Sequence, residues 1–77
     1  MRVFQDPTGR EWEVVVGRES WGTVVAIFFP RKGSEAPRQS LLETSSADEG
    51  NRLLLGMTLE DLQALFVGSV LKPTEGT

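Results

Sequence analysis

Acidic side chains are the main candidates for catalysis in this chain of 77 residues, because it contains no histidine and no cysteine. Those two residue types supply the commonest general base, the commonest metal ligand and the thiol nucleophile. The acidic residues that stand close together are Glu11 with Glu13, Asp48 with Glu49, and Glu60 with Asp61. The first pair falls on the solvent side of a strand, and the other pairs fall in first turns of helices, where carboxylates interact with the helix dipole. Neither setting perturbs a pKa as catalysis requires, so we expect no catalytic residue and no enzymatic activity.

Serine and lysine offer no better catalytic pair. The two lysines are Lys32, in a polar loop, and Lys72, at the expected end of a helix. Neither setting withdraws lysine from water, as an activated lysine requires. The glycines lack the spacing of a phosphate-binding loop, and no acidic loop has the spacing of an oxygen-ligand metal site. The sequence therefore predicts neither a cofactor nor a metal.

Charge is distributed unevenly along the chain, whose net charge is −3. Residues 1–42 carry six basic and five acidic side chains, whereas residues 43–77 carry two basic and six acidic ones. The basic residues that would cluster are Arg31, Lys32 and Arg38, around one loop. Such a loop is either a solvated hairpin tip or a contact for an anionic partner. Because there is no basic stripe, nucleic acid is not an expected partner.

The segment Asp6-Pro7-Thr8-Gly9 predicts the turn of a β-hairpin. Asp accepts hydrogen bonds from the following backbone, Pro presets φ, and Gly takes the left-handed position. A type I turn with a glycine bulge would place Phe4 opposite Trp12. Alternation agrees, because Trp12 falls on the apolar face while Glu11 and Glu13 fall on the other. We expect Trp12 to be a core residue.

The following strand, from Trp21 to Phe29, is apolar on both faces. This pattern indicates a central strand covered on both sides, or covered by the chain's own helix on one side and by a partner on the other. Trp21 begins the strand beside a turn, where a core position and an interface position are both compatible with its ring. Pro30 ends the strand, and a short fourth strand is expected over 38–44.

The last third of the chain predicts two helices. Serine and acid at capping-box spacing favour a short helix over 47–55, and Thr58 begins a longer one that ends near Lys72, before Pro73. On the longer helix, the apolar stripe expected to face the sheet is Leu59, Leu62, Leu65, Phe66 and Val70. A second apolar patch consists of Ala64, Val67 and Leu71. It would be either a partner surface or a part of the core covered by the short helix.

These elements predict an α+β fold: a small antiparallel β-meander of three to four strands, followed by a short helix and a C-terminal helix packed on one sheet face. Residues 1–73 would form a single domain, and residues 74–77 a C-terminal tail. The longest apolar run is too short to span a membrane, and no signal peptide is expected at the N-terminus. The cytoplasm is the expected location.

A domain of this length buries only about 60% of the surface that its unfolded chain exposes. Since disulfides are absent and no metal is expected, a partner is the remaining source of stability. We therefore expect a non-catalytic accessory subunit that binds other protein subunits in a larger assembly, in one version as an extrinsic subunit of a membrane complex. The residues expected to bind the partner are Trp21, Arg31, Lys32, Arg38, Ala64, Val67 and Leu71.

Two alternatives remain open. The chain could be a stand-alone regulator or small-ligand module that forms a homodimer. The last alternative is a domain that binds single-stranded nucleic acid, with Trp21 and Phe28 as a stacking platform beside the basic loop.

Overall fold

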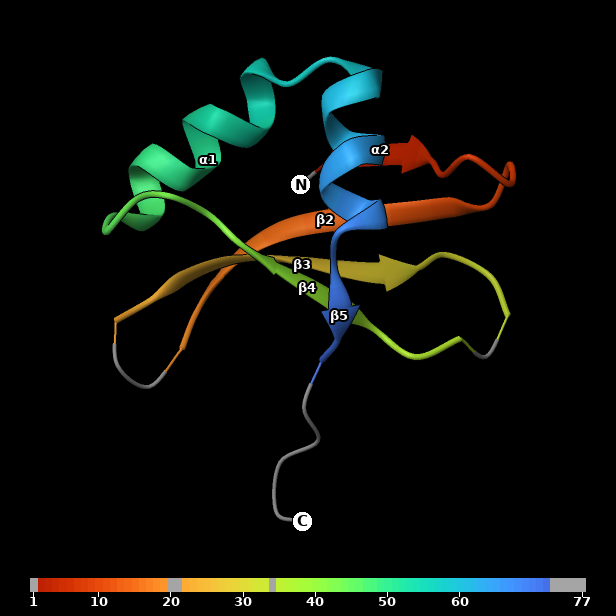
Figure 1. The fold of residues 1–77 in the computed structure, drawn as a ribbon, viewed down its shortest axis with the longest axis horizontal. Coiled ribbons are helices and arrows are strands. Elements are labelled where there is room, and N and C mark those ends of the chain that lie inside the picture. The colour runs from red at the N-terminus through yellow and green to blue at the C-terminus, as the bar shows by residue number, and fades with distance from the viewer. Residues whose placement is uncertain (1, 20–21, 34, 73–77) are drawn as a thin grey trace, which may run out of the picture.

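A computed structural model describes residues 2–19, 22–33 and 35–72 of the chain. Five antiparallel strands form one sheet in chain order, and both helices lie on one side of it (Figure 1). The elements are β1 (Arg2–Gln5), β2 (Glu11–Arg18), β3 (Val24–Pro30), β4 (Arg38–Leu41), α1 (Ala47–Gly56), α2 (Leu59–Val67) and β5 (Val70–Leu71). The predicted α+β meander is confirmed, with one strand more than the sequence indicated.

The first hairpin has the predicted register. Asp6 donates its backbone N–H to the Arg10 carbonyl at 2.8 Å, and Gly9 has the positive φ of 91° that the turn requires. Phe4 consequently lies opposite Trp12, and both side chains are buried, Trp12 with 2% of its surface exposed.

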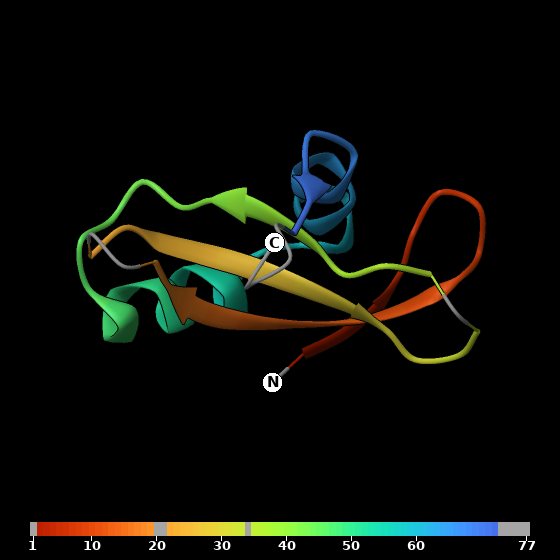
Figure 2. The same ribbon diagram turned by 90° about the horizontal axis from the view of Figure 1, so that it is seen from below.

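The register of the strands divides the sheet into two faces. Residues directly opposite one another on neighbouring strands share a face, and successive residues along a strand alternate between faces. The inner face is the one covered by the helices, and the outer face is the side seen from below in Figure 2. One core joins the inner face to both helices; its buried members are Phe4, Trp12, Val14, Val24, Ala26, Phe28, Leu42, Leu54 and Leu62.

Helix α1 lies close against the sheet at Gly50. Its N-terminus is capped by the Ser46 hydroxyl, which accepts a hydrogen bond from the backbone of Glu49, as the capping-box spacing predicted. A Cβ atom at Gly50 would stand 3.1 Å from a methyl group of Val24, so glycine permits this close approach. At the other end, the Arg2 side chain donates to the Leu54 carbonyl at 2.7 Å, which places a positive charge at the negative end of the helix.

The second helix is shorter than predicted, because α2 ends at Val67 rather than near Lys72. Thr58 caps its start with the predicted capping box. Gly68, a residue that disfavours helix by about 1 kcal/mol, then forms the C-cap, and the Ser69 hydroxyl donates to the Phe66 carbonyl. The chain next forms β5, which pairs with β4 and supplies partners for its backbone.

The early end of α2 makes the predicted helix faces wrong in part. Val70 belongs to β5 and not to the sheet-facing stripe, and Leu59 of that stripe is 52% exposed. The second apolar patch does not form as a helix face, because Leu71 also lies on β5. Its other members, Ala64 and Val67, are exposed on α2.

Replacement of Trp12 tests the hairpin register. Trp12→Ala should lower the free energy of unfolding by about 3–5 kcal/mol, because it leaves a cavity in the core. Glu13→Ala, on the other face of the same strand, should change it by less than about 1 kcal/mol, since its contact with Arg31 is exposed. Urea denaturation of both variants measures the difference. Equal effects at the two positions would show that the faces are assigned wrongly.

Candidate functional site

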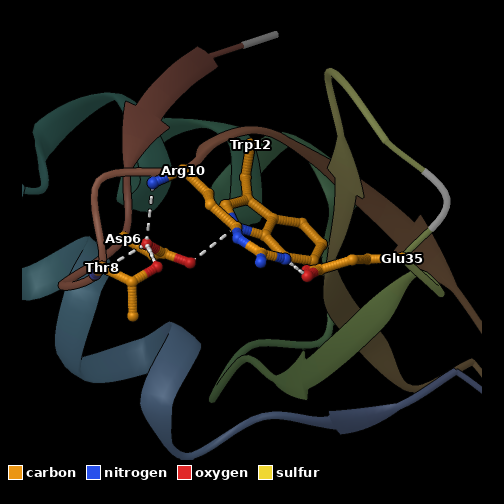
Figure 3. Close-up of polar contacts among 5 residues, drawn as sticks. All are labelled: Asp6, Thr8, Arg10, Trp12 and Glu35. Atoms are coloured by element: carbon orange, nitrogen blue, oxygen red, sulfur yellow. Dashed lines mark hydrogen bonds and ion pairs between the residues drawn. The ribbon is translucent and has the colours of Figure 1, made fainter.

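Asp6 is the most extensively hydrogen-bonded carboxylate at the loop end of the sheet (Figure 3). Its Oδ1 atom accepts from the Thr8 hydroxyl at 2.6 Å, the Thr8 backbone at 2.8 Å and the Arg10 backbone at 3.0 Å. Its Oδ2 atom accepts from the indole Nε1 of Trp12 at 2.9 Å. The carboxylate therefore satisfies the buried indole and holds the turn at the same time.

These hydrogen bonds set the ionisation of Asp6. Burial alone would raise the pKa of this carboxyl, but the hydrogen bonds from Thr8, Trp12 and Arg10 together hold it below the usual value. A carboxylate with a lowered pKa and occupied oxygens is a poor general acid or base at neutral pH. Asp6 is a structural residue of the hairpin.

Two shallow cavities flank the same cluster. The larger, of about 720 Å³, lies between the β1–β2 turn and the β3–β4 loop, and the smaller measures about 500 Å³. Both are lined by Arg10, Trp12 and Glu35, and the ion pair between Arg10 and Glu35 joins the two loops above the indole (Figure 3). The charges around them are mixed in sign, which gives no preference for an anion or a cation. No group of acidic side chains within the described ranges could hold a metal ion.

The basic residues predicted to bind a partner do not form one cluster. Arg31 and Lys32 are exposed in the β3–β4 loop, and Arg31 lies 3.2 Å from the Glu13 carboxylate. Arg38, in contrast, belongs to the inner face: its guanidinium donates to Ser69 at 2.7 and 2.8 Å and lies 5.6 Å from the centre of the Phe66 ring. Trp21, the other predicted contact, lies outside the described residues.

The outer face of the sheet is apolar over three rows of paired residues. The first row is Val3, Glu13 and Phe29; the middle row is Val15, Ile27, Gln39 and Val70; the third row is Gly17, Val25 and Leu41. Seven of these ten side chains are aliphatic or aromatic. Both helices lie on the inner face, so neither covers these rows.

Several side chains of the outer face are exposed to an extent unusual for their type. The exposed fractions are 67% for Leu41, 61% for Val70, 41% for Val3 and 40% for Phe29. Gly17 shapes the third row: a Cβ atom there would stand 2.4 Å from Ile27 Cδ1, so the Ile27 side chain occupies the space that a side chain at position 17 would need. Val25 beside it is only 2% exposed. Ile27 therefore fills the space beside Gly17 and Val25 is buried, while Phe29 remains exposed in the first row.

The sequence predicted that β3 is apolar on both faces, but it did not reveal which residues of other strands complete the outer face. The alternation in β3 indicated an apolar outer side, whereas Val70 was assigned to a helix and Val3 was not considered. The hydrogen bond between Asp6 and Trp12 was also missed. The sequence contained a signal for this hydrogen bond, because a buried indole N–H needs an acceptor. The predicted register already placed Asp6 and Trp12 at the same end of the hairpin.

Comparisons with family models, with curated proteins and with solved structures found no match to this chain. Within the described part of the chain, neither helix is long and apolar enough to cross a membrane.

Replacement of Asp6 tests its structural role through pH. Asp6→Asn should lower the free energy of unfolding at pH 7 by about 1–3 kcal/mol, because an amide has one acceptor where the carboxylate has two. Since the folded pKa is below the unfolded value of about 3.9, the carboxylate's contribution is complete above that value and is lost as the pH falls through the folded pKa.

The difference between wild type and Asp6→Asn should therefore shrink below about pH 4. Urea denaturation from neutral to acid pH measures this difference. Glu11→Gln, which changes an exposed carboxylate of the same hairpin, is the control and should show little effect at any pH. A difference for Asp6→Asn that stays constant down to about pH 2 would contradict the ionic contribution.

Proposed function

We propose that this chain is a non-catalytic accessory domain that binds another polypeptide through the outer face of its sheet, as a subunit of a larger assembly. The cytoplasm, expected from the sequence, remains part of this proposal. The observation that carries the proposal is an apolar sheet face that neither helix covers.

The apolar residues of the outer face lie on neighbouring strands, with Glu13 between Val3 and Phe29 and Gln39 between Ile27 and Val70. Val15 of β2 pairs with Ile27 of β3 in the middle row, and Val25 of β3 pairs with Leu41 of β4 in the third row, so apolar side chains adjoin one another there. Scattered single apolar residues are normal on protein surfaces, but a contiguous patch bordered by polar residues is typical of a protein interface. A sheet face of this kind is commonly covered by another sheet or by helices.

The alternatives have weaker support. A small ligand would need a cavity, and the two cavities at the loop end are shallow, of mixed charge and away from the middle row. A single-stranded nucleic acid would need exposed rings beside a basic cluster. Arg38 is turned toward Ser69, and Phe28 is fully buried, so two members of that arrangement are not exposed.

Two matched leucines allow the outer face to be tested. Leu41 on the outer face is 67% exposed, and Leu55 on α1 is 68% exposed. Leu41→Glu should reduce the protein recovered with the tagged chain from its native source by roughly tenfold or more, because a charge buried in an interface must be desolvated. Leu55→Glu makes the same chemical change away from the face and should leave recovery unchanged. Quantitative mass spectrometry of the recovered protein measures both.

Circular dichroism and thermal unfolding show whether each variant is folded. Equal recovery with folded Leu41→Glu and with wild type would contradict binding through the outer face. A loss restricted to Leu55→Glu would move the interface to the helices.

A further inference from the structure

We propose that residues 68–72 form a conformational switch, which exchanges between strand β5, as in the structure, and a continuation of α2. This inference goes beyond the proposed function, because it concerns how the sheet ends and not what binds its outer face. Only Gly68 and Ser69 separate α2 from β5 (Figure 1). A change in a few backbone angles is therefore enough to move the segment from the sheet to the helix.

The backbone that follows α2 is still close to helical. Gly68 has φ −82° and ψ 0°, and its N–H donates to the Ala64 carbonyl at 3.2 Å, which is the hydrogen bond of an α-helix. The Ser69 N–H donates to the Phe66 carbonyl at 3.0 Å, in the tighter pattern that is frequent at helix ends. Neither Gly68 nor Ser69 has the positive φ of a left-handed C-cap. The helix can therefore continue without any residue leaving a left-handed conformation.

The side chains of the segment are compatible with a helix as well as with a strand. Val70 stands four positions after Phe66, so in a longer helix the two side chains lie on the same side, as the apolar periodicity of the sequence indicated. In β5, the Val70 and Leu71 side chains are 61% and 60% exposed. Release of the strand consequently takes neither side chain out of the core. The backbone hydrogen bonds to β4 are exchanged for those of a further helical turn.

The contact between Arg38 and Ser69 holds the strand state. The Nε atom of Arg38 donates to the Ser69 hydroxyl at 2.8 Å, and its Nη2 atom donates to the Ser69 carbonyl at 2.7 Å. Hydrogen bonds from a charged donor are stronger than the backbone hydrogen bonds that the two states exchange. The strand is therefore the major state, and the release of Ser69 from Arg38 is the step that frees the segment.

The exchange opens and closes one edge of the sheet. Arg38 and Gln39 of β4 pair with β5 on one side and with β3 on the other. When residues 68–72 continue the helix, β4 becomes the edge strand, and its backbone groups on that side are free to pair with a further strand. The switch thus determines whether the chain itself closes this edge.

Saturation-transfer nuclear magnetic resonance of the backbone of residues 68–72 tests the switch, because it gives the population and the carbon chemical shifts of a minor state. In the wild type we expect a minor state of about 1% or more with helical shifts. Ser69→Ala should raise the ratio of this state to the major state by about tenfold or more, since it removes a hydrogen bond to a charged group.

Gly68→Ala should raise the same ratio by up to about fivefold, because alanine favours the helix more than glycine does. The strand state tolerates this substitution, since a Cβ atom at position 68 would stand 3.7 Å from its nearest neighbour. Gly56→Ala is the matched control, because it makes the same change at the last residue of α1, where a Cβ atom meets nothing within 4 Å. It should leave the exchange of residues 68–72 unchanged.

A helical minor state that grows in Ser69→Ala and in Gly68→Ala supports the proposal. A wild type without a minor state overturns it, and so does a minor state with the shifts of an unfolded chain, because β5 then only frays. A helical state that neither substitution increases also overturns it, since the contact with Arg38 is then not what holds the strand. The wild-type measurement needs no substitution, so it decides the question even if a variant fails to fold.

Discussion

Four aromatic rings determine which face of this sheet becomes the core. Phe66 of α2 lies 4.7 Å from Trp12, 5.3 Å from Phe28 and 6.0 Å from Phe4, measured between ring centres. One ring thus joins α2 to three consecutive strands at distances where tilted and edge-to-face rings attract one another. Arg38 stacks over the same ring and holds the chain after α2 through Ser69. Loss of this cluster would separate the helix from the sheet and β5 from β4.

The same cluster has a consequence for the other side of the sheet. Since side chains alternate along a strand, fixing Phe28 inward fixes Ile27 and Phe29 outward. Two short helices cover one face, and the described chain supplies no second layer. The outer face is therefore apolar because β3 is apolar throughout, and neither helix covers it because both helices pack on the inner face. The candidate interface follows from this distribution of side chains and not from any single residue.

Signals within a few residues were sufficient to predict much of the fold. The turn after Asp6, the cap at Thr58 and the end of β3 at Pro30 depend on local backbone chemistry, and all three lie where the sequence placed them. Strand β5 depends instead on β4 and on the hydrogen bonds between Arg38 and Ser69, which are 31 positions apart in the chain. A helical pattern continued through Val70, so periodicity alone could not reveal this pairing.

The same distinction applies to the candidate site. The two-sided character of β3 was visible in the sequence and led correctly to an apolar outer side. The predicted contacts at Val67 and Leu71 failed as a patch because they assumed a helix that ends earlier. The predicted basic cluster failed because Arg38 found a ring and a serine to contact on the inner face. Both errors concern residues whose environment is decided by distant parts of the chain.

Strand β3 also affects the chain before it folds. Its residues Val24 to Phe29 contain no charge, no glycine and no proline, and segments of this composition stack readily into intermolecular β-structure. Pro30 and Arg31 follow immediately. Proline and charged residues limit such stacking, and here they stand at the C-terminal end of the segment. Newly made or denatured chains thus carry a self-associating segment that only the native sheet shields, so competition between folding and aggregation becomes steeper as chain concentration rises.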